Sequence, residues 1–160
     1  PKKCIVIAAP HTSNWDFLIG RCYGYICGIT PKYLIKSSFF APVLGAFFKW
    51  NGGVPVYRNA KHNVVEQLEE RFNSTDDLIL AITPEGTRSR VEKWKTGFYH
   101  IANNANLPIL LLAMDYKNKK VGIINQFIPT DDIEKDMLFI QEQFKNIEGK
   151  IPEKYNPIIS

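Results

Sequence analysis

Short runs of apolar residues alternate along this chain with longer segments in which the apolar residues recur at helical spacing. Runs of four to eight residues that are rich in Ile, Leu and Val are typical of strands buried on both faces of a sheet. We predict strands or extended segments at residues 4–9, 32–36, 54–58, 78–82, 108–115 and 121–127. Pro55 favours an edge position for the third of them, because proline has no N–H to donate to a neighbouring strand.

The segments between these runs carry helix signals. Apolar residues are dense from 14 to 29, and Ser13 with Asp16 fits the Ser-x-x-Asp capping box that begins a helix. We predict further helices at residues 40–50, 60–73, 96–105 and 131–148, the last of them amphipathic. Strands that alternate with helices predict an α/β fold, a single domain with a mixed, mostly parallel β-sheet flanked by helices.

The composition narrows the class of protein. A chain of 160 residues that is 45% hydrophobic and 22% charged is neither disordered nor fibrous, and its length suits one globular domain. The net charge of +4 favours anionic partners. The three cysteines show no Cys-x-x-Cys spacing, which indicates a reduced, cytosol-facing protein rather than a disulfide framework or a zinc ribbon. No apolar run reaches the length of a membrane-spanning helix.

Reactive side chains follow the first buried strand. His11 lies just after it, and Asp16 comes five residues later, in the first turn of the predicted helix. Asp16 would then accept a hydrogen bond from one imidazole nitrogen and leave the other free to remove a proton from a hydroxyl group. Spacing alone favours a plainer alternative, in which Asp16 caps the helix beside a surface histidine.

A second polar segment follows the strand at 78–82. Gly86 allows a tight turn, and Arg88 offers a guanidinium group that binds phosphate oxygens in pairs. Glu85 would pair with Arg88 or accept a hydrogen bond from a substrate hydroxyl. The plainer alternative is a polar surface turn. Since open α/β sheets gather their sites at the carboxyl ends of strands, we expect both segments to meet at one edge.

Four blocks in this order resemble those of the glycerolipid acyltransferases, a family that includes the 1-acylglycerol-3-phosphate acyltransferases. They are His-x-x-x-x-Asp at 11–16, Gly-Val-Pro-Val-Tyr-Arg at 53–58, Pro-Glu-Gly-Thr-Arg-Ser at 84–89 and Leu-Pro-Ile-Leu at 107–110. The resemblance covers about residues 4–115. It implies that residues 1–160 form a single acyltransferase catalytic domain, in which Val54 and Thr83 depart from the residues usual at their positions.

The resemblance also implies roles for individual residues. His11 would be the general base and Asp16 the residue that orients it. The substrate-binding residues would be Arg58, Glu85, Gly86, Thr87 and Arg88. Arg58 and Arg88 would hold the phosphate of the acceptor. No metal site is expected, since neither His62 nor His100 has a second ligand at metal spacing.

The implied activity is transfer of a fatty acyl group from acyl-CoA or acyl-carrier protein to the hydroxyl of a lysophospholipid, such as 1-acylglycerol-3-phosphate. The reaction would need no cofactor and no acyl-enzyme, and no Ser or Cys here lies in a nucleophile-elbow pattern. The enzyme would act in phospholipid biosynthesis, peripherally on the cytoplasmic side of a membrane. We also expect a membrane-attachment segment ahead of Pro1.

Three alternatives stay open. The acceptor would be an amino-acid-based lysolipid if the arginines serve another anionic headgroup. A nucleic-acid-binding module is only a distant alternative, because the basic residues are scattered among acidic ones. We therefore expect no nucleic acid partner. The aromatic segment with Phe39, Phe40, Phe47 and Phe48, flanked by Lys36 and Lys49, would either contact lipid or belong to the core.

Overall fold

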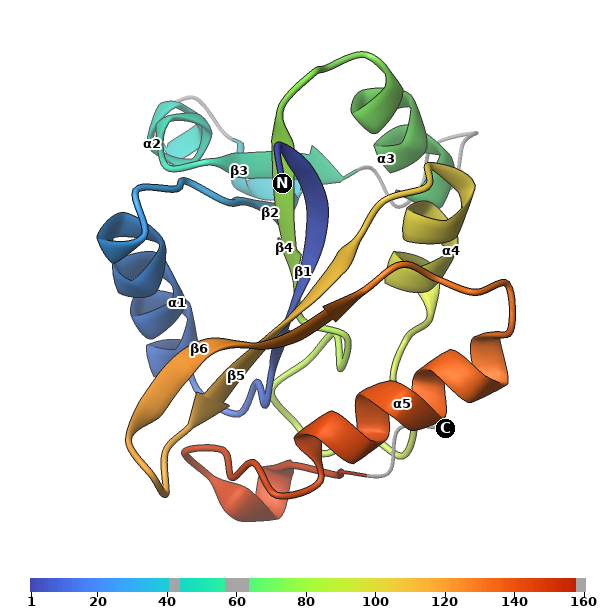
Figure 1. Cartoon of the computed structure of the whole chain (residues 1–160). Helices are drawn as coiled ribbons and strands as arrows, with labels where there is room; N and C mark the ends of the chain where they lie inside the picture. The colour runs from blue at the N-terminus through green and yellow to red at the C-terminus, as the bar shows by residue number, and fades with distance from the viewer. Residues whose placement is uncertain (41–43, 57–63, 158–160) are drawn as a thin grey trace.

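One sheet of six strands organises the protein, a computed structural model of which describes residues 1–40, 44–56 and 64–157. The strands stand in the order β3-β2-β4-β1-β5-β6 (Figure 1). Their bounds are β1 (Lys3–Ala9), β2 (Lys32–Lys36), β3 (Gly53–Val56), β4 (Leu78–Ile82), β5 (Ile109–Asp115) and β6 (Lys120–Phe127). The first five run parallel and β6 runs antiparallel to β5. The predicted α/β fold with a mixed, mostly parallel sheet is confirmed, and Pro55 lies on an edge strand as expected.

The helices divide unequally between the two faces of the sheet. They are α1 (Asn14–Ile26), α2 (Leu44–Trp50), α3 (Val64–Asn73), α4 (Gly97–Asn104) and α5 (Ile133–Phe144), with short 3₁₀ turns η1 (Ser37–Phe39) and η2 (Pro152–Lys154). Figure 1 shows α3, α4 and α5 along one face and α1 on the other, with α2 near the edge formed by β3. One face is therefore covered by three helices and the other mainly by one.

Helices α1 and α5 are shorter than their predicted ranges. The segment 14–29 is helical only to Ile26, because Cys27 caps the helix and Gly28 takes a left-handed backbone with φ of 68°. The segment 131–148 is helical from Ile133 to Phe144. Its start is set by Asp132, whose side chain accepts a hydrogen bond from the amide of Lys135. In both segments the apolar residues at helical spacing continue into a turn that is not helical.

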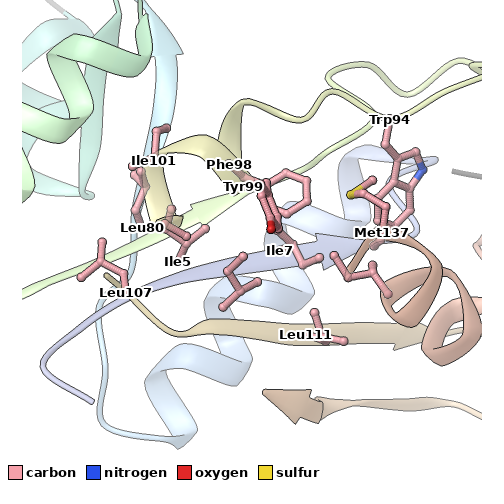
Figure 2. Close-up of a cluster of buried hydrophobic side chains, with 14 of the residues drawn as sticks. Ile5, Ile7, Leu80, Trp94, Phe98, Tyr99, Ile101, Leu107, Leu111 and Met137 are labelled. Carbon is pink, nitrogen blue, oxygen red and sulfur yellow. The ribbon is translucent and has the colours of Figure 1, made fainter. Parts of the chain in front are cut away.

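The main core lies between the sheet and helices α3, α4 and α5. Residues of β1 alternate between the two faces, so Ile5 and Ile7 enter this core while Val6 faces α1. Figure 2 shows Ile5 and Ile7 beside Leu80 of β4 and Leu111 of β5. Helical and loop residues complete the cluster, among them Trp94, Phe98, Tyr99, Ile101, Leu107 and Met137. The cluster beneath α1 is smaller, with Cys4, Val6 and Leu112 as its buried members.

The carboxyl edge of the sheet brings distant segments together. Strand β1 pairs in parallel with β4 on one side and β5 on the other, so the loops after all three strands leave at the same edge. The segment after α5 runs across that edge (Figure 1). There the amide of Ile151 donates to Thr12 Oγ1 at 3.2 Å, and Gly149 lies close against Thr12 and Pro10. The loops that follow β1 and β4 carry the predicted site residues apart from Arg58, which follows β3 and lies outside the described residues.

Candidate active site

The structure brings His11 and Asp16 together. Ser13 is the N-cap of α1 and Asp16 its third residue, and both halves of the predicted capping box are present. His11 lies in the turn before the helix, where its Nδ1 faces Asp16 Oδ2 at 3.2 Å, at an angle outside that of a well-formed hydrogen bond. The His11 side chain is 19% exposed, whereas that of Asp16 is 1% exposed. The carboxylate of Asp16 is therefore buried, whereas the imidazole of His11 reaches solvent.

Asp16 is surrounded by hydrogen-bond donors. Its Oδ2 accepts from the amides of Thr12 and Ser13 at 2.7 and 2.8 Å, and its Oδ1 accepts from the hydroxyl of Tyr116 at 2.6 Å. Burial raises the pKa of Asp16, but the contacts with His11, Tyr116, Ser13 and Thr12 lower it by more, and the pKa lies below its ordinary value. Asp16 is therefore ionised at neutral pH and ready to accept a proton donor such as His11 Nδ1–H.

Glu85 is a second buried carboxyl group at this edge, and it does not pair with Arg88 as the sequence suggested. Its Oε1 instead accepts from the amide of His11 at 2.9 Å, while Oε2 has no hydrogen-bond partner in the described part of the chain. Burial, with a smaller contribution from the negative charge of Asp16, raises the pKa of Glu85 to about 7. Glu85 thus holds the backbone amide of His11. The two residues are 74 positions apart in sequence, so no local pattern predicted this contact.

Gly86 and Arg88 take different positions in the loop after β4. Gly86 has a φ of 68°, which confirms the predicted tight turn, and its amide donates to the carbonyl of Thr83 at 3.0 Å. Arg88 is exposed and donates to the side chain of Asn14, the first residue of α1. This bond joins the loop after β4 to the start of the helix that carries Asp16. Arg88 therefore stands at the mouth of the site rather than beside Glu85.

We call His11 and Asp16 the dyad. A polar pocket opens next to it. Thr12, Ser13 and Asn14 line one side, and Thr87, Arg88, Ser89, Ile151 and Lys154 line the rest. Arg88 and Lys154 give the pocket two cationic groups, and the first residue of α1 adds the positive end of a helix dipole. An anionic group is the natural occupant of such a pocket. Thr87 and Arg88 were predicted as substrate-binding residues, and the structure places both in its wall.

Two residues of the site were not found from the sequence. Tyr116 and Lys154 both lie beyond the four sequence blocks, and neither is part of a short motif. Tyr116 follows β5, and the carboxyl end of a strand in a mostly parallel sheet is a position that could have indicated it. Lys154 arrives through the segment after α5, whose path across the edge no local pattern predicts.

Several predicted residues lie elsewhere or outside the described residues. Arg58 and His62 fall within 57–63, which the structure does not describe, so the role of Arg58 stays a prediction. His100 is exposed on α4, with its ring against that of Tyr99. Among the described residues, no group of three His, Cys, Asp or Glu side chains is arranged to hold a metal ion. The side chains of Lys36 and Phe39 also lie outside the description.

Apolar side chains are exposed on the outer face of α1. Trp15, Leu18 and Tyr25 recur at helical spacing, and each has half or more of its surface exposed. Helix α2 adds Phe47 and Trp50, exposed by 52% and 77%. Arg21 of α1 donates to the side chain of Asn51 at 2.9 Å, which ties the end of α2 to α1. We call these five aromatic and aliphatic side chains the apolar surface. No helix in the described part of the chain is long and apolar enough to cross a membrane.

The part of the chain that forms this site matches a known protein family. The model of the family described as Acyltransferase matches residues 1–115, a range that contains the dyad and the loop after β4. The chain belongs to the acyltransferase family. Tyr116 and Lys154 lie outside the matched range, whereas His11, Asp16 and Arg88 lie within it.

Curated relatives of this chain carry the name 1-acyl-sn-glycerol-3-phosphate acyltransferase. The protein of Haemophilus influenzae is 31% identical over 128 residues, which cover 71% of this chain and 48% of the relative. The protein of Escherichia coli is 24% identical over 124 residues, covering 74% of this chain and 49% of the relative. The chain thus spans about half the length of these relatives.

A solved structure shows the same fold. The crystal structure of the 1-acyl-sn-glycerophosphate acyltransferase PlsC from Thermotoga maritima covers 93% of this chain and 69% of its own, with a TM-score of 0.59. Its sequence identity to this chain is 18%. This likeness confirms the architecture predicted from the four blocks.

Proposed function

We propose that this chain is the catalytic domain of an O-acyltransferase that moves a fatty acyl group from a thioester to the hydroxyl of a lysophospholipid. The acceptor is 1-acylglycerol-3-phosphate or a close analogue, and the donor is acyl-CoA or acyl-carrier protein. Membership of the acyltransferase family and the names of the relatives support this assignment. The single observation that carries it is the contact between solvent-facing His11 and buried Asp16.

The dyad supplies the base that the reaction needs. A hydroxyl group attacks a thioester slowly unless its proton is removed as the new bond forms. Asp16, ionised and held by its donors, lies 3.2 Å from His11 Nδ1, and its negative charge favours the proton on Nδ1, which leaves Nε2 as the proton acceptor. The acceptor oxygen then bonds to the thioester carbon, the tetrahedral intermediate expels the thiolate, and the proton on His11 neutralises it. This sequence of steps requires no metal, no cofactor and no acyl-enzyme.

The polar pocket positions the acceptor. Arg88 and Lys154 bind its phosphate, which brings the neighbouring hydroxyl toward His11 and converts binding into orientation. Glu85 and Gly86 shape this arrangement indirectly, the first through the His11 amide and the second through the turn that presents Thr87 and Arg88. Arg58 joins this set as the second phosphate-binding arginine in our proposal, on the resemblance alone.

The apolar surface brings the enzyme to its lipid substrate. It begins at Trp15, one residue after Asn14 of the pocket, and continues over α1 and α2. Lys49, exposed in the last turn of α2, adds a charge that favours anionic headgroups. We propose that this surface lies against the membrane on its cytoplasmic side, which places the mouth of the pocket at the headgroup level. Phe47 belongs to it, whereas Phe40 and Phe48 are half-buried and pack against each other.

Replacing His11 by Ala tests the dyad. Loss of the base lowers turnover by about 10²- to 10⁴-fold in an assay that follows the thiol released from acyl-CoA in the presence of 1-acylglycerol-3-phosphate in mixed micelles. His100→Ala is the matched control, because His100 is exposed and lies on α4. It keeps wild-type turnover. Undiminished activity of His11→Ala would rule out the mechanism.

A panel of acceptors and donors sharpens the substrate assignment. We expect the highest kcat/KM with acceptors whose phosphate is a monoester, because the two cations of the pocket match its two negative charges. Lysolipids with a zwitterionic or amino-acid-based headgroup serve as comparisons. A preference for an amino-acid-based lysolipid would keep the chemistry and replace the acceptor. The same panel run with acyl-CoA and acyl-carrier protein assigns the donor.

A further inference from the structure

Tyr116 reaches the dyad from the neighbouring strand. It follows β5 directly, and its hydroxyl donates to Asp16 Oδ1 at 2.6 Å across 100 positions of sequence. The sheet makes this contact possible because β1 and β5 run parallel with Ala9 opposite Ala113. The loop that follows β1 therefore lies beside Tyr116, the first residue after β5.

The backbone around Tyr116 is fixed from two sides. Its amide donates to the carbonyl of Glu148 at 2.9 Å, which ties it to the segment after α5. The carboxylate of the preceding Asp115 accepts from the amide and the side chain of Asn118, at 3.2 and 2.7 Å, and so closes the turn that follows β5. The Tyr116 ring thus projects from a held backbone. Its hydroxyl is placed by the fold rather than by a flexible loop.

The two oxygens of Asp16 have different partners. Oδ2 is shared by the amides of Thr12 and Ser13 and the Nδ1 of His11, all from one short stretch of chain. Oδ1 accepts only from Tyr116 within the described residues. A carboxylate held at one oxygen still turns about the bond to its side chain, whereas one held at both has a fixed plane. The direction in which Oδ2 faces His11 then depends on Tyr116.

We propose that Tyr116 is a positioning residue that fixes the plane of the Asp16 carboxylate and thereby holds His11 with its proton on Nδ1. This inference rests on the proposed function, in which His11 accepts the substrate proton through Nε2. The tautomer of a histidine is set by the hydrogen bond that its other nitrogen makes. For His11 the partner of that nitrogen is Asp16 Oδ2, which lies 3.2 Å from Nδ1, and Tyr116 acts on this contact through Asp16 without touching the substrate.

Tyr116→Phe removes the hydroxyl and keeps the ring. The imidazole ¹⁵N resonances of His11, assigned by comparison with His11→Ala, report the tautomer of the neutral ring without any substrate. We expect a single Nδ1–H tautomer in the wild type and a mixture with the Nε2–H tautomer in the variant. We also expect kcat to fall about tenfold to a hundredfold, the range for loss of a hydrogen bond to a charged group, with both KM values within about twofold.

The matched control is Tyr99→Phe. Tyr99 is buried in the main core and donates to Asp136 Oδ2 at 2.9 Å, so its substitution removes the same kind of tyrosine–aspartate bond on the face of the sheet that α3, α4 and α5 cover. We expect it to leave both the His11 tautomer and kcat unchanged. Wild-type tautomer and kcat in Tyr116→Phe would overturn the proposal. Tautomer mixing in a protein that transfers no acyl group would support the role of Tyr116 and reject the proposed function.

A double-mutant cycle keeps the test sharp if Tyr116→Phe is less stable than expected. When Tyr116 acts only through Asp16, its substitution has no further effect on kcat in an Asp16→Asn background. Effects on kcat that add in the double variant would show that Tyr116 acts by another route, and the proposal would fail. Circular dichroism spectra of all four proteins establish that each one is folded.

Discussion

The two faces of the sheet are built from the same strands and the same kinds of residue, yet they are finished differently. On the face covered by α3, α4 and α5, Ile5, Ile7 and Leu111 are fully buried. On the other face, α1 covers Cys4 and Val6 and leaves its own outer side apolar and exposed. We call them the covered face and the open face. The difference indicates that stability is concentrated on the first, whereas the second keeps the exposed apolar surface that we propose contacts lipid.

Adjacent leucines of β5 measure this difference most directly. Leu111 enters the covered face and Leu112 the open face, with exposures of 0% and 6%. Within the range of about 2–5 kcal/mol for a buried Leu→Ala change, we expect about 4 kcal/mol for Leu111→Ala and about 2 kcal/mol for Leu112→Ala. The free energies of unfolding, measured in urea, give both values. Equal losses would contradict the comparison.

The burial of Glu85 at the carboxyl edge of the sheet makes the stability of the protein depend on pH. Its pKa is raised from an ordinary value of 4.5 to about 7, so the folded state holds this proton more tightly than the unfolded state does. Stability from this group is fully present below about pH 4.5 and is lost as the pH rises through 7, by about 3 kcal/mol for a shift of this size.

Glu85→Gln removes that titration and keeps an oxygen for the His11 amide. We expect the free energy of unfolding of the variant, relative to the wild type, to increase between pH 5 and pH 8. Urea unfolding of both proteins at a series of pH values measures the difference. A constant difference across this range would show that Glu85 titrates as an ordinary carboxyl group.

Lys154 tests whether the segment after α5 belongs to the site. Replacing it by Ala removes one of the two cations of the pocket, and we expect KM for a phosphate-bearing acceptor to rise about fivefold, the upper range for an exposed charge. Turnover at saturating acceptor stays near that of the wild type. Lys135→Ala, an exposed lysine on α5, is the matched control and leaves KM unchanged. A similar change in both variants would remove Lys154 from the pocket.

The smallest effect on stability is expected on the apolar surface of α1. Leu18→Ser with Tyr25→Ser changes the free energy of unfolding by less than about 1 kcal/mol, because both side chains are at least half exposed. The same pair of changes weakens co-sedimentation with vesicles that contain anionic phospholipid. Lys135→Ala again serves as the control. A large loss of stability, or unchanged binding to vesicles, would show that this side of α1 has another task.

The predictable parts of the fold are those with local causes. The bounds of β2 and β4 match the predicted ranges, since a short apolar run ends where polar residues begin. The capping box located the start of α1, but the left-handed Gly28 that follows its end was missed, because apolar residues continue past it. Helix α5 was predicted too long for the same reason. Apolar spacing reports which residues are buried, and backbone conformation decides where the helix stops.

The site divides in the same way. His11 and Asp16 are five positions apart, so one motif and one helix start were enough to place them together. Glu85 lies at the expected edge but does not form the pair with Arg88 that was one of its two predicted contacts, and its bond to the His11 amide was not predicted because it depends on how β1 and β4 align. Arg88 bonds to Asn14 for a comparable reason. Partners that meet only through the sheet were beyond the reach of a linear pattern.

The contacts that hold the dyad in place span very different distances in sequence. This difference bears on the order of folding. His11 and Asp16 are neighbours from the moment the chain emerges, yet Tyr116 joins them across 100 positions and Ile151 joins Thr12 across 139. Contacts between such remote positions form late, because a long loop must close before they contribute. We therefore expect the two groups of the dyad to meet early and their geometry to be completed only when the opposite end of the described chain has folded onto them.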